Sequence, residues 1–454
     1  MSIVILAAGQ GTRMRSALPK VLHPLAGVPL LEHAWRAARA LGDVRIQIVY
    51  GHGGALVRER LQHLDAGWVE QCEQLGTGHA VAQALPGIAD DDTVLILYGD
   101  VPLIGVQTLQ ALVAAAAPTG FAILTAEPGD PTGYGRIVRD DAGRVARIVE
   151  QKDASPAELA LREINTGMMA VAAQRLKPWL ARLDRGNAQG EYYLTDIVAM
   201  AAAAGVPVAS AQPDFEWEAS GVNSKVQLAE LERVHQRNVA TGLLEAGVTL
   251  ADPARIDVRG MLSTGRDVFI DVGCVFEGDV VLGNDIFIGP NCVLKNVRVR
   301  AGTRIEAFSH LEDAEIGAHC RVGPFARLRP GAQLGEHVHI GNFVEVKKSV
   351  FGAGSKANHL SYVGDSEVGS KVNIGAGTIT CNYDGVNKSK TIIGDGAFIG
   401  SDTTLVAPIT IGPGAYIGAG STITREAPAD KLTLTRAKQT TVENWKPPKK
   451  KPAA

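Results

Sequence analysis

A strict six-residue spacing of branched aliphatic side chains runs through the C-terminal half of the chain. Its clearest stretch consists of Ile393, Ile399, Leu405, Ile411, Ile417 and Ile423. An α-helix repeats its apolar face about every 3.6 residues and a β-strand every second residue, so a period of six fits neither element alone. The spacing predicts a solenoid of short strands and turns, in which each repeat adds one aliphatic side chain to a continuous core.

The same spacing extends back to about residue 248, with interruptions. The earlier aliphatic positions are Ile270, Leu282, Ile288, Leu294, Ile316, Val322, Leu328, Leu334, Ile340, Val346, Val368 and Ile374. The phase slips near residues 299–315, 346–351 and 382–390, which predicts short repeats or inserted loops there. Loops that leave a regular solenoid are frequent places for a functional site.

The N-terminal half has a different pattern, in which short apolar runs alternate with helical stretches. The runs that predict buried strands are residues 3–6, 45–50, 94–97 and 121–125, and the helical patterns between them cover about 32–41, 55–64 and 105–116. This alternation predicts an α/β domain with a largely parallel sheet. Two later runs, at about 135–139 and 145–150, fit a hairpin or a mixed sheet edge.

A helix is predicted between the two halves. Ser224 and Gln227 have the spacing of a capping box, an apolar stripe follows them, and Gly247 ends the pattern. The stripe consists of Leu228, Leu231 and Val234. The expected organisation is a domain over 1–224, a linker helix over 225–247, a solenoid domain over 248–436 and a disordered basic tail over 437–454.

Length and charge narrow the possible functions. A chain of 454 residues exceeds what one hydrophobic core usually covers, and a formal net charge of −3 gives no sign of a nucleic-acid partner. No basic leader and no apolar stretch of membrane-spanning length is recognisable. We therefore expect a soluble, cytoplasmic protein without membrane insertion.

The cysteines suggest structure rather than chemistry. None of the five forms a C-x-x-C pair, so neither a zinc site nor a redox motif is expected. Cys274, Cys292 and Cys320 each lie four residues after an aliphatic position of the repeat. We interpret them as small buried side chains rather than as a disulfide.

A glycine-rich segment follows the first predicted strand, in the motif Leu-Ala-Ala-Gly-Gln-Gly-Thr-Arg-Met over residues 6–14. Such a turn at the carboxyl end of a parallel strand can present backbone N–H groups to phosphate. Neither the dinucleotide fingerprint nor the Walker A pattern is satisfied, so a simple tight turn fits equally well. Arg13 and Lys20 add two cations, which favours a polyphosphate ligand.

Asp100 follows another predicted buried strand, over residues 94–97, at the edge where open α/β sheets bind ligands. A carboxylate in this position could bind the Mg²⁺ of a nucleoside triphosphate. An ordinary Gly-Asp turn explains the same residues.

His359 lies beside a slip in the solenoid repeat. A histidine can take the proton of an attacking amine near neutral pH, although an exposed loop histidine is the commoner explanation of such a residue. Several cations recur near the expected coil corners, at Arg327, Arg329, Lys347 and Lys348. They could bind a sugar phosphate or could cover a solvated face.

Together these motifs resemble a known family. Residues 6–14 with Pro-Lys-Val-Leu at 19–22 are similar to the signature of sugar-1-phosphate nucleotidyltransferases. Followed by a hexapeptide solenoid, residues 1–436 resemble the bacterial bifunctional N-acetylglucosamine-1-phosphate uridyltransferase / glucosamine-1-phosphate N-acetyltransferases. The resemblance implies a Rossmann-like nucleotidyltransferase domain, a connecting helix and a left-handed parallel β-helix. The hand is taken from the family, because the usual crossover preference suggests the opposite.

For the first domain the resemblance implies binding of UTP and UDP-N-acetylglucosamine. Arg13 and Lys20 would neutralise the triphosphate during catalysis, while Asp100 and Asn223 would hold Mg²⁺. The other residues implied to contact the nucleotide or the sugar are Leu6, Ala7, Ala8, Gly9, Gln71, Gly76, Thr77, Tyr98, Gly99, Gly135, Glu150 and Asn165. The sugar phosphate would attack the α-phosphorus of UTP, and pyrophosphate would leave.

For the solenoid the resemblance implies acetyl transfer from acetyl-CoA to glucosamine-1-phosphate, with His359 as the base. The residues implied to bind glucosamine-1-phosphate are Arg329, Lys347, Tyr362, Asn373, Asn382 and Tyr383. Those implied to bind acetyl-CoA are Ala376, Asn382, Tyr383, Ser401, Ala419 and Arg436. The family also implies a homotrimer with this site between neighbouring solenoids. The expected protein is thus a two-site enzyme that makes UDP-N-acetylglucosamine.

Two other functions fit parts of the pattern. A nucleotidyltransferase with one site could use the solenoid only for oligomerisation and regulation, but the cluster around His359 and Tyr362 argues against it. A non-catalytic scaffold with a degenerate sugar-nucleotide sensor is disfavoured by the intact Arg13, Lys20 and Asp100.

Overall fold

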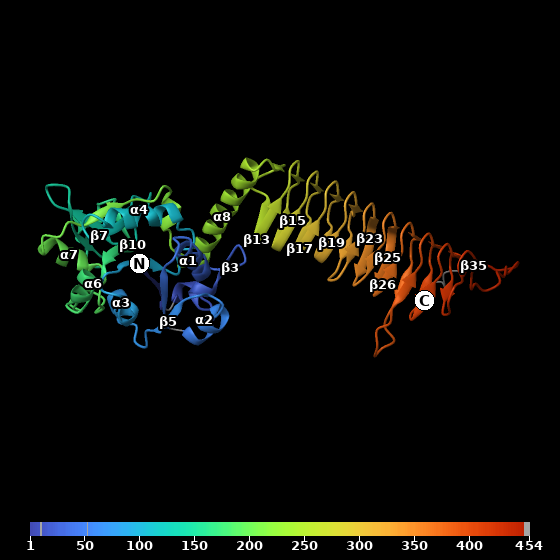
Figure 1. Ribbon diagram of the computed structural model, residues 1–454, viewed down its shortest axis with the longest axis horizontal. Coiled ribbons are helices and arrows are strands. Elements are labelled where there is room, and N and C mark those ends of the chain that lie inside the picture. The colour runs from blue at the N-terminus through green and yellow to red at the C-terminus, as the bar shows by residue number, and fades with distance from the viewer. Residues whose placement is uncertain (10, 52, 449–454) are drawn as a thin grey trace, which may run out of the picture. The chain divides into compact units, whose positions relative to one another are not determined.

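The structure is a computed structural model that describes residues 1–9, 11–51 and 53–448. The chain divides into two compact units, Met1–Asn238 and Val239–Ala454, and the boundary falls within helix α8, Lys225–Glu245 (Figure 1). Within the described ranges, no helix is both long enough and apolar enough to cross a lipid bilayer. Each unit has its own hydrophobic core.

The N-terminal unit is built on a nine-stranded sheet whose main path runs in the order β11-β7-β10-β6-β1-β4-β5. Its strands are β1 Ser2–Ala7, β4 Arg45–Tyr50, β5 Gly67–Glu70, β6 Thr93–Tyr98, β7 Phe121–Ala126, β8 Arg136–Arg139, β9 Val145–Val149, β10 Ile164–Ala172 and β11 Ala209–Ala211. A separate hairpin joins β2 Pro24–Leu25 and β3 Val28–Pro29. Strands β1, β4, β5 and β6 are parallel, whereas β10 runs antiparallel to β6 and β7. The four predicted strands are confirmed, and β8 and β9 form the predicted hairpin.

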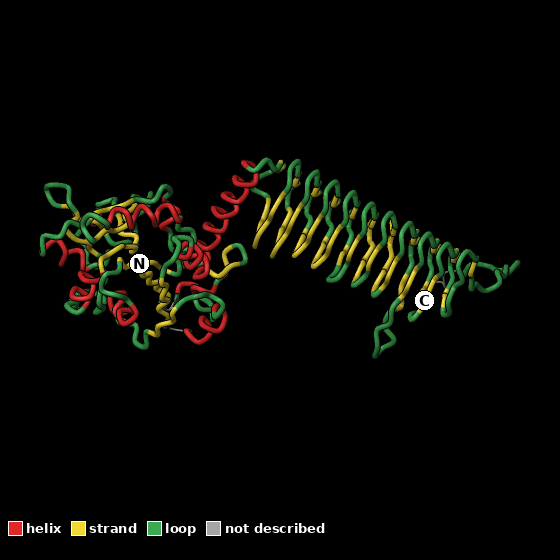
Figure 2. Tube along the Cα trace, viewed as in Figure 1, coloured by secondary structure: helices red, strands yellow, loops and turns green. Residues whose placement is uncertain are grey.

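Helices cover the sheet of this unit on both faces (Figure 2). They are α1 Leu30–Arg39, α2 Gly54–Leu61, α3 Thr77–Ala84, α4 Val106–Ala116, α5 Pro156–Leu159, α6 Ala173–Leu180 and α7 Asp196–Ala203. Because side chains alternate along a strand, Ile3 and Ile5 pack with α1, α2 and α4, while Val4 and Leu6 pack with α3, α6 and α7. The predicted helices correspond to α1, α2 and α4; the sequence patterns did not predict α3, α6 and α7.

The C-terminal unit is a parallel β-helix of short strands, each paired with the strand of the next coil. The strands of its first part are β12 Thr249–Leu250, β13 Ile256–Thr264, β14 Phe269–Ile270, β15 Cys274–Leu282, β16 Phe287–Ile288, β17 Val293–Val299, β18 Arg304–Ile305, β19 His310–Ile316, β20 Arg321–Val322, β21 Arg327–Leu328, β22 Gln333–Leu334 and β23 His339–Lys347. Those of its second part are β24 Val350–Phe351, β25 Lys356–Gly364, β26 Ser366–Val368, β27 Asn373–Ile374, β28 Ile379–Cys381, β29 Thr391–Ile393, β30 Phe398–Ile399, β31 Thr404–Val406, β32 Ile409–Ile411, β33 Tyr416–Ile417, β34 Thr422–Ile423 and β35 Leu432–Thr433. The predicted solenoid is therefore confirmed.

The strand register explains the slips in the sequence period. Phe269 pairs with Phe287, eighteen residues later, but Phe287 pairs with Arg304, seventeen residues later. The pairing of Asn373 with Phe398 spans twenty-five residues because the loop 382–390 is inserted between β28 and β29. The slips thus correspond to shortened coils and to one inserted loop, as the interrupted period predicts.

The coils turn at three columns of corner residues with positive φ. One column, which we call the His359 corner, consists of Gly273, Asn291, Phe308, Phe325, Phe343, Leu360, Gly377, Asp402 and Gly420. Glycine and asparagine adopt positive φ readily, whereas phenylalanine and leucine rarely do. The rings of Phe308, Phe325 and Phe343 stack with centroids 5.0 and 5.3 Å apart, which stabilises these bulky corner residues against one another.

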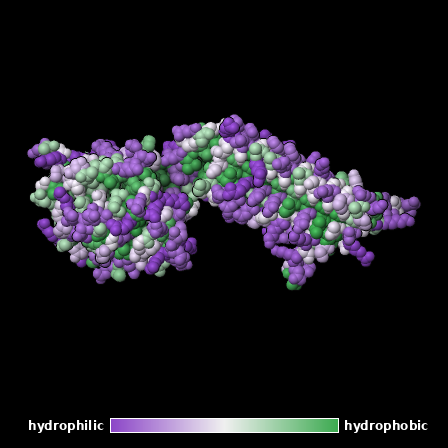
Figure 3. Space-filling model, in the orientation of Figure 1, coloured by the Kyte–Doolittle hydropathy of each residue, from purple (hydrophilic) through white to green (hydrophobic). Residues whose placement is uncertain are grey.

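The aliphatic side chains of the repeat fill the interior of the β-helix. All the predicted positions from Ile270 to Ile423 belong to one buried cluster. Cys274, Cys292 and Cys320 are buried free thiols, and the Sγ of Cys274 donates to the Gly289 carbonyl at 3.2 Å. Their prediction as buried structural side chains is confirmed. On the face drawn in Figure 3, hydrophilic positions predominate on the outside of the coils.

Residues 437–448, the first part of the predicted tail, are exposed and form no helix or strand. The remaining tail residues, 449–454, lie outside the described residues.

The buried repeat positions should carry much of the stability of the β-helix. Ile340 is fully buried, whereas Ile392 is 42% exposed on an outer face. We expect Ile340→Ala to lower the free energy of unfolding of this unit by about 2–5 kcal/mol, because it leaves a cavity in the core. The matched change Ile392→Ala should cost less than about 1 kcal/mol. Guanidinium unfolding followed by circular dichroism measures both, and equal losses would contradict this packing.

Candidate functional sites

The first candidate site is a cavity of about 470 Å³ at the carboxyl ends of β1 and β6. It is lined by Leu6, Ala7, Ala8, Gly9, Lys20, Val21, Gln71, Gln74, Gly76, Thr77, Ala80, Tyr98, Asp100 and Glu191. The parallel strands bring these segments to one sheet edge, and the Gly99 N–H donates to the Leu6 carbonyl at 2.9 Å. The structure thereby gathers most of the predicted nucleotide contacts around one cavity.

The side-chain ammonium group of Lys20, which lines this cavity, is held by two oxygen atoms. Lys20 Nζ forms an ion pair with the Asp100 carboxylate and donates to the amide oxygen of Asn223 at 3.1 Å. The side chains of Lys20 and Asp100 are only 12% and 17% exposed. The three residues, which come from distant parts of the sequence, form what we call the Lys20 cluster.

The start of α8 holds Asn223 in this cluster. The Asn223 N–H donates to the Gln227 side-chain oxygen at 2.8 Å, and the Gln227 N–H donates to Ser224 Oγ at 3.2 Å. The capping contacts predicted for Ser224 and Gln227 are thus present, but the glutamine caps Asn223 rather than Ser224. The Val222 N–H donates to the Asp100 carbonyl at 2.8 Å, which joins the two predicted metal ligands through the main chain.

The Lys20 cluster fits a divalent cation as well as an ammonium group. One carboxylate and one amide oxygen converge on Lys20 Nζ. Oxygen donors of this kind suit Mg²⁺, which usually takes one or two protein carboxylates and completes its shell with phosphates and water. Within the described ranges, no group of three or more His, Cys, Asp or Glu side chains could hold a metal on its own. A metal here would therefore depend on oxygens of the substrate.

Arg13 lies apart from these contacts. It belongs to a short 3-10 turn, Thr12–Met14, and its side chain is exposed. No ion pair or hydrogen bond of Arg13 is found among the described residues, and it does not line the cavity. The neighbouring residue of the motif, Gln10, lies outside the described residues.

The predicted uracil contacts lie at the start of α3. The Gln71 side-chain amide donates to the Gly76 carbonyl at 3.1 Å, and Thr77 Oγ accepts from the Leu194 N–H at 3.1 Å. Gly76 has φ 111°, and a Cβ there would lie 2.6 Å from the Tyr192 carbonyl oxygen. Only glycine fits this turn.

The predicted sugar contacts form a second connected group. The Asn165 N–H donates to the Gly135 carbonyl at 2.9 Å, and a Cβ on Gly135 would lie 3.3 Å from Glu150 Oε2. Burial raises the pKa of the Glu150 carboxyl, and the hydrogen bond from Thr195 Oγ at 3.1 Å opposes this only in part. Burial and the nearby Glu150 carboxylate also raise the pKa of Tyr98.

Four residues of the cavity wall were not predicted: Val21, Gln74, Ala80 and Glu191. Gln74 donates to the Gln71 carbonyl at 3.1 Å, and its place within the loop 71–78 was a usable signal. Glu191 reaches the wall from a segment far along the chain. No local pattern marks it.

The second candidate site surrounds His359 in β25. His359 is exposed, and its Nδ1 lies 3.0 Å from the amide oxygen of Asn342, which occupies the same position on β23 one coil earlier. Because an amide oxygen can only accept, Nδ1 carries the proton in this contact, and in the neutral imidazole the free lone pair is then on Nε2. Asn342, which was not predicted, therefore leaves His359 able to act as a base.

Three of the predicted acetyl-CoA contacts form one column beside the His359 corner, whereas Asn382 and Tyr383 lie outside it. The strand register places Ala376, Ser401 and Ala419 one coil apart. The Ala376 carbonyl accepts from the Asp402 N–H at 2.6 Å and the Ser401 carbonyl from the Gly420 N–H at 2.8 Å. A Cβ on Gly420 would lie 3.8 Å from Arg436, so this residue lies against the end of the same column.

A second lysine cluster lies at another corner. Lys347 Nζ pairs with Asp365 at 3.0 Å, and the Asn382 amide donates both to Asp365 and, at 3.5 Å, to the Tyr362 hydroxyl. The hydrogen bond to Asp365 raises the pKa of Lys347. Asp365 was not predicted. Asp365 thus connects Lys347 with Asn382, and Asn382 in turn contacts Tyr362.

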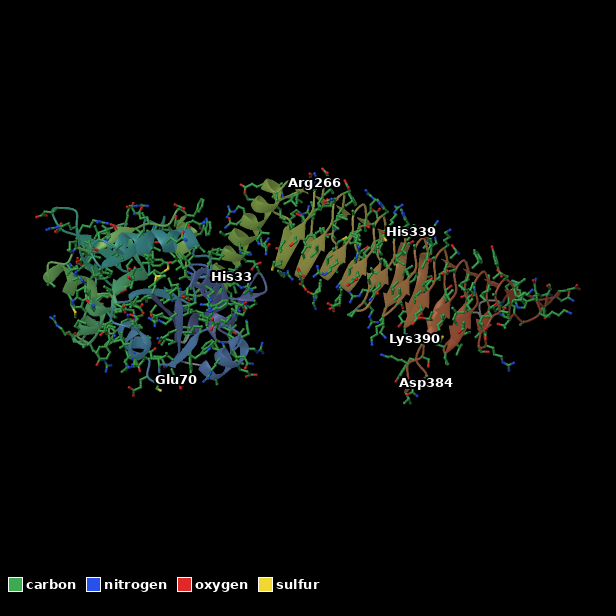
Figure 4. All side chains as sticks on the ribbon, in the orientation of Figure 1. His33, Glu70, Arg266, His339, Asp384 and Lys390 are labelled. Atoms are coloured by element: carbon green, nitrogen blue, oxygen red, sulfur yellow. The ribbon has the colours of Figure 1, made fainter. Side chains whose placement is uncertain are left out.

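The remaining predicted contacts are more dispersed. Arg329 pairs with Glu345 at 2.8 Å on the coil before Lys347, and Asn373 is a partly buried residue of β27. Tyr383 lies on the inserted loop 382–390, where it bridges to Lys388 and is exposed. Figure 4 shows this loop extending from the coils, with Asp384 far from them and Lys390 at the base. His359 lies at one corner of the β-helix, whereas Lys347, Asp365 and Asn382 lie on successive coils at another corner.

Comparisons with known proteins cover both units. Residues 3–196 match the family described as MobA-like NTP transferase domain, and residues 313–348 and 390–425 match the bacterial transferase hexapeptide family. The Bifunctional protein GlmU of Janthinobacterium sp. (strain Marseille) is 64% identical over 450 residues, which is 99% of each chain. That of Aromatoleum aromaticum is 62% identical over 453 residues, with 100% of each chain covered. A solved nucleotidyl transferase from Methanothermobacter thermautotroptrophicus covers 52% of this chain and 98% of its own, at 21% identity and a TM-score of 0.39, a likeness too low to carry an argument.

The raised pKa of Glu150 predicts a pH-dependent stability. Between the unfolded and folded pKa values, the folded state keeps a proton that the unfolded state has lost, so this group destabilises the fold as pH rises. We expect Glu150→Gln, which keeps the acceptor for Thr195, to raise the thermal unfolding midpoint at pH 8. The gain should shrink towards pH 4.

Glu158 is the matched control for that measurement. Hydrogen bonds from Ser155, together with Arg147, lower the pKa of Glu158 to about 2. Glu158→Gln should therefore lower the unfolding midpoint at pH 8, the opposite direction. A loss of stability at pH 8 in Glu150→Gln would show that this carboxyl is not penalised by burial.

Proposed function

The chain belongs to the GlmU family of bifunctional proteins, and from this we propose that it makes UDP-N-acetylglucosamine in two steps. The C-terminal unit transfers an acetyl group from acetyl-CoA to glucosamine-1-phosphate. The N-terminal unit then transfers a uridylyl group from UTP to N-acetylglucosamine-1-phosphate. The observation that carries the proposal is the pair of chemically different sites, the Lys20 cluster in one unit and the His359–Asn342 pair in the other.

In uridylyl transfer, a phosphate oxygen of the sugar phosphate bonds to the α-phosphorus of UTP, and the bond to the β-phosphate breaks. Pyrophosphate leaves with the electron pair. The nucleophile is already an anion, so the protein needs to position it and to neutralise charge rather than to remove a proton. Lys20 lines the cavity beside Ala8 and Gly9, and Arg13 would act from the exposed turn Thr12–Met14.

We assign the Mg²⁺ requirement to Asp100 and Asn223. Both supply oxygen donors at the Lys20 cluster, which suits this ion. Bound there, Mg²⁺ would supply charge neutralisation for the phosphates. Gln71, Gly76 and Thr77 would orient the uracil ring, and Glu150 and Asn165 the sugar.

In acetyl transfer, His359 Nε2 takes a proton from the amino group of glucosamine-1-phosphate. The nitrogen then bonds to the carbonyl carbon of acetyl-CoA, the carbon–sulfur bond breaks, and the thiolate of CoA leaves. Asn342 orients the imidazole by accepting from Nδ1. Lys347 and Arg329 would bind the sugar phosphate, and the column from Ala376 to Ala419 would hold acetyl-CoA.

We propose that the protein is a cytoplasmic homotrimer. Phe308, Phe325, Phe343 and Leu360 form an exposed apolar ridge at the His359 corner, with 51%, 46%, 57% and 64% of their surfaces exposed. A ridge of this kind favours burial against another protein surface. A second copy covering it would lie beside His359 and could complete the acetyl-transfer site. The cytoplasm follows from the substrates, acetyl-CoA and UTP.

Separate assays of the two half-reactions test the proposal. With glucosamine-1-phosphate and acetyl-CoA, His359→Ala should reduce the release of free thiol by about 10²–10⁴-fold, because the general base is lost. With N-acetylglucosamine-1-phosphate, UTP and Mg²⁺, the same variant should release pyrophosphate like the wild type. Asp100→Ala should do the reverse. If either variant stops both reactions while folded, the two sites are not independent.

Asn342 offers a finer test of the His359 geometry. Asn342→Leu removes the acceptor for Nδ1, so the imidazole loses its fixed tautomer and orientation. We expect kcat for thiol release to fall roughly tenfold, with a changed pH profile and an unchanged KM for acetyl-CoA. Asn342→Asp, which keeps an acceptor, should retain more activity than the leucine variant. Equal losses in both would exclude a positioning role for Asn342.

A further inference from the structure

One pair of oxygens in the nucleotide site can serve two different cations. The Asp100 carboxylate and the Asn223 amide oxygen both contact Lys20 Nζ. They are also the two protein ligands assigned to Mg²⁺. Within the described ranges, Asp100 has no other cationic partner. The same oxygens are therefore already engaged before any metal binds.

We propose that Lys20 is the resident counter-ion of Asp100 and the hydrogen-bond donor to Asn223, and that a divalent cation must displace it. The inference rests on the proposed function in taking these two residues as the metal ligands. Free protein would then bind a divalent cation weakly. The triphosphate would strengthen metal binding because it gives the ammonium group of Lys20 another anion to bind.

Charge is the reason for the mutual exclusion. Two positive charges a few ångströms apart repel strongly where water is partly excluded, and a single carboxylate cannot neutralise both. Lys20 and Asp100 are both largely buried. A divalent cation that arrives while the ammonium group remains in place would meet this repulsion. If the ammonium group leaves, the Asp100 carboxylate is left unpaired. The metal ion can then take the place of the ammonium group.

The main chain of Asp100 and Asn223, which carries the two oxygens, is held by contacts that do not involve Lys20. The Asp100 carbonyl accepts from the Val222 N–H, and the Asn223 N–H donates to Gln227, both at 2.8 Å. Lys225 Nζ also lies 2.9 Å from His23 Nδ1, which ties the start of α8 to the end of the turn Lys20–Leu22. The ligands can therefore stay in place while the lysine side chain moves.

The glycine-rich turn provides the second position for Lys20. A Cβ on Gly11 would lie 2.6 Å from the Cβ of Lys20, so the stem of the lysine packs directly on this turn. Lys20 also lines the same cavity as Ala8 and Gly9. A phosphate bound to backbone N–H groups of the turn would lie within reach of the lysine. Binding of the triphosphate would thereby draw Lys20 away from Asp100.

Binding of Mn²⁺ to the full-length protein without nucleotide tests the inference. The free ion is measured by electron paramagnetic resonance. Lys20→Met keeps most of the stem and removes the charge, so it should bind Mn²⁺ at least about tenfold more tightly than the wild type, a typical coupling between two ligands. Lys20→Arg keeps the charge and should bind Mn²⁺ as weakly as the wild type.

A matched control comes from the same unit. Lys177 in α6 also pairs with an aspartate, Asp90, but that carboxylate is 77% exposed. Lys177→Met should leave Mn²⁺ binding unchanged. The gain in Lys20→Met should disappear when Asp100→Asn is added. An unchanged affinity in Lys20→Met, or a gain that survives Asp100→Asn, would overturn the proposal.

A measurement on the wild type covers the case in which Lys20→Met does not fold. Saturating Mg²⁺ should expose the Lys20 ammonium group and raise its rate of reductive methylation, measured by mass spectrometry, while Lys177 reacts as before. An unchanged Lys20 rate at saturating Mg²⁺ would overturn the displacement. None of these readouts needs turnover, so failure of the proposed function would appear separately, as absent pyrophosphate release by the wild type.

Discussion

Most coils of the β-helix turn at their corners within seventeen or eighteen residues, and this constraint organises the C-terminal unit. The backbone meets it with positive φ at the corner residues, where glycine, asparagine and aspartate are the least strained. Parallel register then stacks equivalent residues in columns. His359 precedes the corner residue Leu360, and Ala376, Ser401 and Ala419 precede Gly377, Asp402 and Gly420. The candidate acetyl-CoA column is therefore a consequence of how the coils turn.

The N-terminal unit reaches a similar result by a different route. Parallel strands β1 and β6 end at one sheet edge, where the glycine-rich turn and Asp100 meet. The α8 start then adds Asn223 through main-chain and side-chain hydrogen bonds. The geometry of the Lys20 cluster depends on a single place where distant chain segments meet. That of the β-helix depends on the repeated coils. A small change in either segment would separate the ligands.

In both candidate sites, the lysine that we propose to bind phosphate is already held in an ion pair with an aspartate. Lys20 is paired with Asp100 and contacts Asn223, while Lys347 is paired with Asp365, which also accepts from Asn382. Under the proposed function, a substrate phosphate would have to compete with the aspartate for the ammonium group in each case. This arrangement avoids leaving a partly buried charge unpaired in the free protein. Substrate binding would then exchange one ionic partner of the lysine for another.

Repeated or local patterns could be recognised in the sequence alone. The six-residue period predicted the β-helix, its core and the buried cysteine positions. The alternation of runs predicted strands β1, β4, β6 and β7 and helices α1, α2 and α4, but not strands β5, β10 and β11. The contact of Lys20 with Asn223, and the roles of Asn342, Asp365 and Glu191, were decided only by the tertiary structure. A sequence period depends on which side chains are apolar, and each repeat shows the same apolar pattern. A single contact between distant residues depends instead on crossovers and on coil lengths of seventeen or eighteen residues, where one residue more or fewer changes the partner.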